Sequence, residues 1–357
     1  MIEATPSPDT PDGDNASVPE LRTYGWDDAW ETAFEPFRRQ GMSPGRAAVQ
    51  HRGAYDVMTE QGDVRARVAP RLRRASTPAD FPVVGDWLGL DGNWVVQAVL
   101  PRRTAFVRRA AADTGSGTVR EQVVAANVDV VLVAAALGQE LDPLVLERYV
   151  TLALQSGAQP VILLTKADLE AEPESVASEL EGVGGAIPIH FVSSTSGIGV
   201  ERIRSLIGPG VTGALLGPSG VGKSTLVNQL AGDASLLETG DVRSDGSGRH
   251  TTVRRQLVLL PGGGLLIDNP GMREVHLWLA DDGLDAAFDD IAELAATCRF
   301  SDCRHETEPG CAIQTALADG TLARDRWERY RALEAELEAL ARRLDAHDSR
   351  GRKRREG

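Results

Sequence analysis

The sequence predicts a multidomain fold: an N-terminal β-barrel of the OB type, a central α/β domain of the P-loop type, and a mainly α-helical C-terminal domain that binds zinc. Three observations indicate this organisation. Five short alternating stretches separated by turn residues lie within residues 46–110, a glycine-rich phosphate loop lies at 217–225, and all three cysteines lie at 298–311. A chain of 357 residues, 42% of them hydrophobic, has room for two or three such domains.

The N-terminal segment carries no sign of export or membrane insertion. Residues 1–25 form an acidic, proline-rich leader that we expect to be disordered, and a helical segment is expected at 26–45. The longest apolar run, 128–137, is too short to span a membrane and contains Asp129, so it predicts a buried strand. With so few cysteines, the chain is expected to be cytoplasmic and to have no membrane partner.

The barrel is assigned to residues 46–112. Its span 46–110 holds eleven arginines against six acidic residues, although the whole chain has a formal net charge of −14. Such charge asymmetry predicts contact with nucleic acid. Its aromatic residues offer either stacking surfaces or core packing, and packing is the expectation for most of them: Tyr55, Trp87, Trp94 and Phe106. The expected strands are 46–50, 55–59, 64–68, 83–90 and 95–100.

The phosphate loop fits G-x-x-x-x-G-K-[ST] and stands between an apolar strand at 211–216 and a helix at 223–231. At such a turn, successive backbone N–H groups form a nest for phosphate. Lys223 would add a positive charge to binding and catalysis, and the Ser224 hydroxyl would reach Mg²⁺. The loop residues are Gly217, Pro218, Ser219, Gly220, Val221, Gly222, Lys223, Ser224 and Thr225.

The base-reading motif is Thr165-Lys166-Ala167-Asp168, a variant of N-K-x-D at the end of the apolar strand 160–164. The Asp168 carboxylate could accept from both N1–H and the 2-amino group of guanine, a donor pair that adenine lacks. After the next strand, 187–192, Ser193 and Ser194 open a loop that resembles the S-A-x-x-G-x-G motif beside guanine O6. These two motifs predict GTP and GDP as ligands; an ATP-dependent enzyme is the alternative, opposed by Asp168.

The base-reading motif precedes the phosphate loop, which reverses the order of an ordinary GTPase. Residues 113–280 therefore predict a circularly permuted P-loop GTPase domain. Its switch elements follow the phosphate loop: Thr251 and Thr252 offer a second hydroxyl ligand to Mg²⁺, and Asp268 and Gly271 fit D-x-x-G. Asp268 would act through magnesium-bound water, and the Gly271 N–H would sense the γ-phosphate.

The position after D-x-x-G, where an ordinary small GTPase has a water-orienting glutamine, is Met272. An apolar side chain cannot orient water, so we expect slow intrinsic hydrolysis. His250 is the candidate catalytic residue; a capping or surface role is the alternative.

The cysteine window predicts a structural zinc site. Three thiolates and one imidazole form a closed tetrahedral set without an open catalytic position, and the alternative is three buried free thiols. The predicted ligands are Cys298, Cys303, His305 and Cys311. This zinc-binding helical domain is assigned to 281–346.

The chain ends in an amphipathic stripe and a basic tail. We expect the stripe to pack on the zinc domain, with a partner surface as the alternative. The tail, 347–357, could be solvated or could neutralise RNA phosphate. The stripe comprises Trp327, Tyr330, Leu333, Leu337, Leu340 and Leu344.

The motif order, G-P-S-G-V-G-K-S-T, G-R-H-T-T, D-N-P-G and the cluster ending E-P-G-C together resemble the RsgA/YjeQ family of circularly permuted GTPases, over about residues 45 to 345. The resemblance implies an OB-fold, a permuted GTPase domain, a zinc domain and action on the small ribosomal subunit and its rRNA during late maturation. Asn269 and Ser194 depart from the commoner Thr and Ala of the family motifs, and the role of the leader is open.

The expected function is GTP hydrolysis by a monomer, with ribosome-stimulated turnover and nucleotide-dependent subunit binding. The alternative is an RNA-binding assembly factor that keeps GTP as a static structural ligand. The second switch, 268–271, would lead through one helical stretch, 284–297, into the zinc domain, so its rearrangement could reposition that domain.

Overall fold

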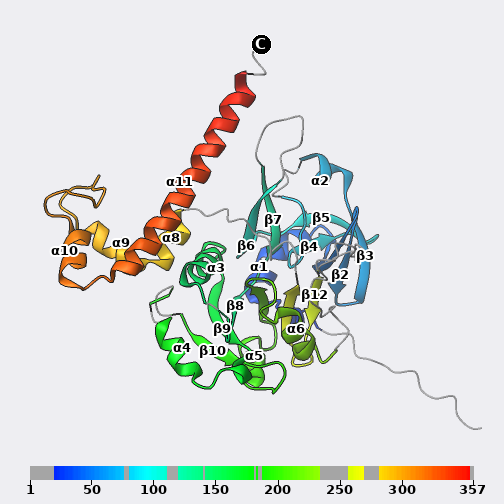
Figure 1. Cartoon of the computed structure of the whole chain (residues 1–357). Helices are drawn as coiled ribbons and strands as arrows, with labels where there is room; N and C mark the ends of the chain where they lie inside the picture. The colour runs from blue at the N-terminus through cyan, green and yellow to red at the C-terminus, as the bar shows by residue number, and fades with distance from the viewer. Residues whose placement is uncertain are drawn as a thin grey trace, which may run out of the picture.

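A computed structural model describes the chain in eight stretches: residues 20–75, 80–110, 120–139, 141–180, 182–183, 187–233, 256–268 and 281–353. Residues 1–19 of the leader and the last four residues, 354–357, lie outside them, as do most of the predicted switch residues discussed below. Figure 1 shows a body of barrel and α/β sheet, with the C-terminal helices on one side.

The end of the 1–25 leader, which was expected to be disordered, instead forms η1 (Leu21–Tyr24), because the side chains of Leu21 and Tyr24 are buried. Helix α1 (Asp28–Arg38) follows. Helix α1 begins where the Asp27 carboxylate accepts a hydrogen bond from the Trp30 backbone N–H at 2.9 Å. The Trp30 ring is buried with its centroid 6.2 Å from that of Trp87 in the barrel. This helix therefore packs on the barrel. It lies within the helical segment expected at 26–45 but ends at Arg38, because β1 begins at Ser43.

The predicted five-stranded barrel is confirmed. Because β1 pairs with both β2 and β4, the ladder β1-β2-β3-β5-β4 closes on itself. The short helix α2 (Pro70–Ala75) follows β3. The strands are β1 (Ser43–His51), β2 (Ala54–Thr59), β3 (Gly62–Val68), β4 (Trp87–Leu90) and β5 (Val95–Val99).

The fourth strand is shorter than the predicted 83–90. Residues 83–86 form a turn, in which the Asp86 carboxylate accepts from the Val83 N–H at 2.8 Å. Gly85 has a φ of +92°, and a Cβ there would lie 2.0 Å from the Ala126 carbonyl oxygen. The close approach of another segment at this glycine ends the extended conformation.

The barrel aromatics mostly have the packing role. Tyr55, Trp87 and Phe106 are at most 4% exposed, and only Trp94 is half-buried. They therefore stabilise the interior and do not offer stacking faces to solvent.

The GTPase sheet has the order β10-β9-β8-β11-β13-β12, and every pair except β12–β13 is parallel. Strand β12 also pairs antiparallel with β1 at Gln256 and Val49, which joins this sheet to the barrel. The strands are β8 (Val130–Ala136), β9 (Gln159–Thr165), β10 (Ile189–Val192), β11 (Thr212–Leu216), β12 (Gln256–Leu259) and β13 (Leu265–Asp268).

Helices cover both faces of this sheet. Because successive side chains of a strand alternate, Val131 of β8 lies in one apolar cluster with Val150 of α3, whereas Leu132 lies in another with Ile203 of α5 and Leu226 of α6. The helices are α3 (Pro143–Gln155), α4 (Pro173–Glu179), α5 (Val200–Leu206) and α6 (Lys223–Ala231). An additional hairpin, β6 (Ala105–Ala110) with β7 (Arg120–Ala126), was not predicted from the sequence.

The C-terminal region contains α8 (Asp281–Ala287), α9 (Asp289–Ala296), α10 (Ala312–Asp319) and α11 (Arg324–Lys353). The single helical stretch predicted at 284–297 is wrong, because the chain leaves helical geometry at Phe288, with φ −126° and ψ 48°. This break lets the Phe288 ring bury completely against Tyr330, with centroids 5.5 Å apart.

The last helix is longer than its apolar stripe. Leu333 and Leu337 are buried in the main cluster, so packing against the body holds for this part of the stripe. The helix continues through Lys353, and Figure 1 shows its last turns extending away from the body. None of the helices formed by the described residues has the length and apolarity needed to cross a membrane.

Candidate nucleotide site and zinc centre

The predicted nucleotide motifs meet at one edge of the parallel sheet. Thr165, the last residue of β9, is in register with Ala136 of β8 and Val192 of β10, and Leu216 of β11 is in register with Val133. The base-reading loop, the serine loop and the phosphate loop all leave the sheet at these carboxyl ends. Open parallel sheets bind ligands at this edge.

The phosphate loop depends on glycine at its first position. Gly217 has a φ of +139°, and a Cβ there would lie 2.3 Å from the Ala134 carbonyl oxygen of the neighbouring strand. Gly220 and Gly222 also have positive φ, and Gly222 is the N-cap of α6. The loop therefore turns sharply from β11 into α6. Its backbone N–H groups lie at the N-terminus of α6, a position where phosphate binds favourably.

Lys223 is held against the loop that precedes it. Its ammonium donates to the carbonyl oxygen of Gly217 at 2.8 Å and to that of Pro218, and the residue is 7% exposed. The positive charge is thus confined to the loop, within reach of phosphate oxygens bound there.

The first residue of the base-reading motif connects the two loops. The Thr165 hydroxyl donates to the carbonyl oxygen of Val221 at 2.6 Å and contacts that of Ala135 at 3.1 Å. Leu137 N–H donates to Thr165 O at 2.9 Å. The base-reading strand is therefore tied to the phosphate loop and to the end of β8, a role that the motif match alone did not reveal.

The base reader is accessible. Lys166 has a φ of +56°, which turns the chain into the short helix η2 (Ala167–Leu169) and leaves the Asp168 carboxylate exposed at the sheet edge. Leu169 beside it is 66% exposed.

The serine loop is built on a partly buried hydrogen bond. Ser193 is fully buried, and its hydroxyl accepts from the Ser196 N–H at 3.1 Å, while Ser194 is half-buried. Gly199 closes the loop, since a Cβ there would lie 1.9 Å from the Phe191 carbonyl oxygen. These contacts fix the backbone that would face the guanine edge.

Part of the predicted switch machinery is not described. His250, Thr251, Thr252, Gly271 and Met272 lie outside the described residues. The backbone of Asp268 ends β13, which pairs with β11, so this residue stands beside the phosphate-loop strand. Ser224 is half-buried in the first turn of α6. Hydroxyl and carboxylate oxygens are among the ligand types that Mg²⁺ accepts.

The four predicted zinc ligands lie together, with all ligand atoms within 4.8 Å of one another. The Sγ atoms of Cys298 and Cys311 are 3.9 Å apart, and His305 Nδ1 lies 3.5 Å and 3.4 Å from them. Tetrahedral zinc, with bonds of about 2.3 Å to sulfur and 2.0 Å to nitrogen, places two sulfurs about 3.8 Å apart and sulfur and nitrogen about 3.5 Å apart. The residues therefore fit the ion.

Backbone amides support the ligand set. Ala312 N–H donates to Cys298 Sγ at 3.4 Å, and Gln314 N–H donates to Cys311 Sγ at 3.5 Å. The Gln314 side chain also donates to the His305 carbonyl oxygen at 2.5 Å. Such contacts orient metal ligands and stabilise thiolate charge. This role for Gln314 was not predicted from the sequence, because the spacing of the cysteines and the histidine says nothing about which residues contact them.

Comparisons with known proteins agree with this geometry. The family model described as RsgA GTPase matches residues 99–278. The small ribosomal subunit biogenesis GTPase RsgA of Streptomyces coelicolor is 44% identical to the chain over 332 residues, covering 91% of this chain and 89% of that protein. The protein of the same name from Opitutus terrae is 41% identical over 341 residues, covering 91% and 92%.

Solved structures share the fold. YjeQ from Thermotoga maritima superposes with a TM-score of 0.62 at 25% identity, covering 83% of this chain and 98% of that one. YloQ, described as a circularly permuted GTPase, superposes with a TM-score of 0.61 at 21% identity over 84% of this chain and 96% of its own. The permuted motif order and the arrangement of domains thus have structural counterparts.

Proposed function

The chain belongs to the RsgA GTPase family, and on that premise we propose that it hydrolyses GTP during late maturation of the small ribosomal subunit, with turnover stimulated by the subunit and subunit affinity set by the nucleotide. The proposal draws its partner from the name of the relatives, small ribosomal subunit biogenesis GTPase. Family membership supports a GTP-hydrolysing enzyme of ribosome biogenesis. Stimulation of GTP turnover by the subunit and nucleotide-dependent binding to the subunit are proposed in addition.

The observation that carries the enzymatic part is the tie between Thr165 and Val221, which unites base reading and phosphate binding at one sheet edge. Asp168 accepts from the guanine edge, the Ser193 loop supports guanine O6, and the loop from Gly217 to Thr225 surrounds the phosphates. Lys223 neutralises charge that develops on the transferred phosphoryl group.

Magnesium supplies charge neutralisation of the β- and γ-phosphates when bound with GTP. Ser224 and Asp268 would hold it, together with Thr251 or Thr252. The Gly271 N–H would contact the γ-phosphate. His250 is the proposed water-positioning residue, because Met272 occupies the position where an ordinary small GTPase has its water-orienting glutamine. Cys298, Cys303, His305 and Cys311 would hold a zinc ion that stabilises the loop from 298 to 311, and four protein ligands would leave it no open position for catalysis.

The barrel is the proposed rRNA-binding domain, and the structure reduces the number of its arginines that are available to contact RNA. Arg46 is buried, donating to backbone carbonyls of Tyr24, Gly85 and Asn127, and Arg102 binds the buried Asp86 at 2.7 Å. These two guanidinium groups serve the fold and are not available to RNA.

Two further barrel arginines are engaged at the surface: Arg103 binds Asp27 at 2.6 Å, and Arg65 binds Asp56. Exposed arginines also lie on the β1–β2 turn, β3 and α2, at Arg52, Arg67, Arg71 and Arg73, of which Arg73 donates to the carbonyl oxygen of Gly53 at 3.5 Å. This arc is the proposed phosphate-contacting surface. The chain is proposed to work as a cytoplasmic monomer, because the subunit is its partner.

The test is steady-state GTP turnover with and without purified small subunits, together with cosedimentation under GDP, GTP and a non-hydrolysable analogue. We expect slow turnover alone, strong acceleration at saturating subunits, and binding that depends on the nucleotide. Equal turnover in both conditions, with binding that ignores the nucleotide, would favour the alternative of an assembly factor that holds GTP as a static ligand.

A further inference from the structure

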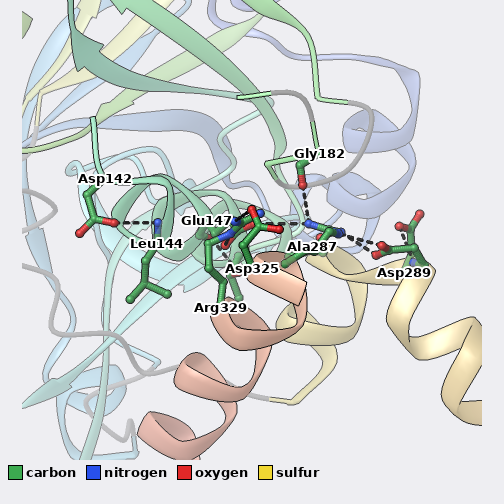
Figure 2. A network of polar contacts seen from close by, with 11 residues as sticks. Asp142, Leu144, Glu147, Gly182, Ala287, Asp289, Asp325 and Arg329 are labelled. Carbon is green, nitrogen blue, oxygen red and sulfur yellow. Dashed lines mark hydrogen bonds and ion pairs between the residues drawn. The ribbon is translucent and has the colours of Figure 1, made fainter. Parts of the chain in front are cut away.

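A buried ionic network joins the GTPase domain to the C-terminal module, defined here as residues 281–339 with α8, α9, α10 and the first half of α11. Figure 2 shows Glu147 of α3 facing Arg329 of α11. The Glu147 carboxylate is fully buried and accepts from Arg329 Nε at 2.8 Å and from Arg326 Nη1 at 3.3 Å. The two arginine side chains are only 16% and 8% exposed.

Arg326 connects four elements through its five N–H groups. It donates to Asp290 of α9 at 2.7 Å and 2.6 Å, to the carbonyl oxygen of Ala287 in α8 at 3.2 Å, to Glu147, and to the carbonyl oxygen of Gly182. The guanidinium of Arg326 is thus fully satisfied only when the module lies on the GTPase domain.

The network is asymmetric. Each arginine keeps a carboxylate partner inside its own module, Asp290 for Arg326 and Asp325 for Arg329, the latter at 2.9 Å. On the GTPase side, among the described residues, Glu147 is the only charged group of this buried network. Burial raises the pKa of Glu147, and the two guanidinium groups act against that shift by stabilising the carboxylate.

The helices that meet at this network approach each other closely. A Cβ at Gly283 of α8 would lie 2.7 Å from Gln155 Cβ and 3.1 Å from the Thr151 carbonyl oxygen of α3. The apolar cluster that contains Val150 and Leu284 holds the helices together, but non-directional packing does not fix their angle as two directed charge contacts do, one to each oxygen of Glu147.

We infer that Glu147 is the orienting residue of this interface: its carboxylate fixes the orientation in which the C-terminal module, with its predicted zinc site, packs on the GTPase domain. Because the two arginines retain their own carboxylates, the module can leave α3 as a folded unit, and Glu147 determines the angle at which the module packs on α3. Glu147 lies on α3, the helix that follows β8. The carboxyl end of β8 is hydrogen-bonded to Thr165, so the residue that orients the module is connected to the sheet edge that carries the proposed nucleotide site.

The test is hydrogen exchange of the full-length, zinc-loaded protein and its Glu147→Gln variant, which keeps the shape of the side chain and removes its charge. We expect amides of α8, α9 and the first turns of α11 to exchange on the order of 10²-fold faster, because one partner of a buried ion pair has lost its charge. Amides of α6 and the barrel should keep their rates, and zinc should stay at one equivalent.

Two further variants make the result specific. Glu336→Gln removes the partner of Arg148 at the exposed margin of the same interface, where the side chains are 34% and 47% exposed, and should change exchange little. Gly283→Val separates α8 from α3 sterically and should reproduce the Glu147→Gln pattern without altering any charge.

Three results would overturn the inference: unchanged exchange in Glu147→Gln, equal acceleration in Glu336→Gln, or acceleration that spreads to α6 with loss of zinc, which would make Glu147 an ordinary core residue. A second measurement rests on the proposed function. Basal GTP turnover of Glu147→Gln should be unchanged, whereas its stimulation by small subunits should fall about fivefold or more. If the unaltered protein is not stimulated at all, the proposed function fails while the exchange result stands.

Discussion

The hydroxyl of Thr165 donates to the carbonyl oxygen of Val221 at 2.6 Å, and this contact joins the base-reading loop to the phosphate loop across 56 positions of sequence. Thr165 is 4% exposed, so water cannot easily replace the donor. In this chain, the Thr that stands in place of the Asn of N-K-x-D therefore does more than fill a turn: it links the two ends of the proposed nucleotide site.

Thr165→Val keeps the β-branched shape at the end of β9 and removes the hydroxyl. The Val221 carbonyl would lose its donor in a buried position, which costs about 1–3 kcal/mol. We expect GDP affinity to fall roughly tenfold, equivalent to about 1.4 kcal/mol, as measured by titration calorimetry. Thr165→Ser, which retains the hydroxyl, is the matched control, and equal losses in both variants would show that the bridge is not responsible.

Much of this site is visible in the sequence because its motifs are local. The phosphate loop, the base-reading motif and the cysteine cluster are each short runs whose chemistry demands fixed spacing, and apolar strands before Thr165, Ser193 and Gly217 place them at strand ends. Family comparisons confirm the predicted membership, and the sheet register brings the base-reading loop, the serine loop and the phosphate loop to one edge.

The features that sequence reasoning missed are those that depend on distant partners. The break at Phe288 follows from burial of its ring against Tyr330, and Glu147 lies 179 positions from its partner Arg326. Hydrophobic periodicity is a local signal, so it predicts neither feature. The turn at Gly85 results from the approach of Ala126. Tertiary contacts override local propensity in each case.

The basic arc of the barrel predicts a salt-dependent defect. Arg67, Arg71 and Arg73 replaced together by Ala should weaken subunit binding and reduce its log–log salt slope by roughly 2–3, because each phosphate contact contributes about 0.7–0.9. GTP affinity should hardly change. Binding would be measured by cosedimentation from low to high salt.

Arg39→Ala is the control for that experiment, since Arg39 is an exposed arginine just after α1 that already pairs with Glu35. Its effect on subunit binding should be small. A triple variant with the full affinity and salt slope of the unaltered protein would place the RNA-contacting face elsewhere.

Zinc should be bound at one equivalent, and Cys303→Ser should remove it. A structural zinc site of this type contributes about 10–16 kcal/mol of binding free energy in small peptides, so the loop from 298 to 311 should lose its protection from proteolysis. Cys311 also caps α10 by accepting from Gln314 N–H, so that helix should fray as well. Metal analysis and limited proteolysis would measure both effects.

The matched control is Ser301→Ala, an exposed position inside the same loop. It should keep its zinc and its protease resistance. If Cys303→Ser retained one equivalent of zinc, the ligand assignment would be wrong; if metal were lost with no change in proteolysis, zinc would not be structural.

The base reader offers the most discriminating variant. Asp168→Asn turns one carboxylate oxygen into an amide donor, so the side chain can no longer accept from both N1–H and the 2-amino group of guanine. Xanthine carries a carbonyl oxygen in place of that amino group, which the amide N–H can meet while the amide oxygen still accepts from N1–H. Specificity should therefore move from GTP toward XTP.

The loss for GTP should reach roughly 10⁴-fold where the polar reader is left mispaired in the closed site. The exposed position of Asp168 on η2 means that its replacement should leave the fold intact, so nucleotide selection changes while stability does not. Competition of GTP, XTP and ATP against a labelled nucleotide would be measured for both proteins. An Asp168→Asn variant that still preferred GTP would show that this carboxylate does not read the base, and a preference for ATP in the unaltered protein would favour an adenine nucleotide as the substrate.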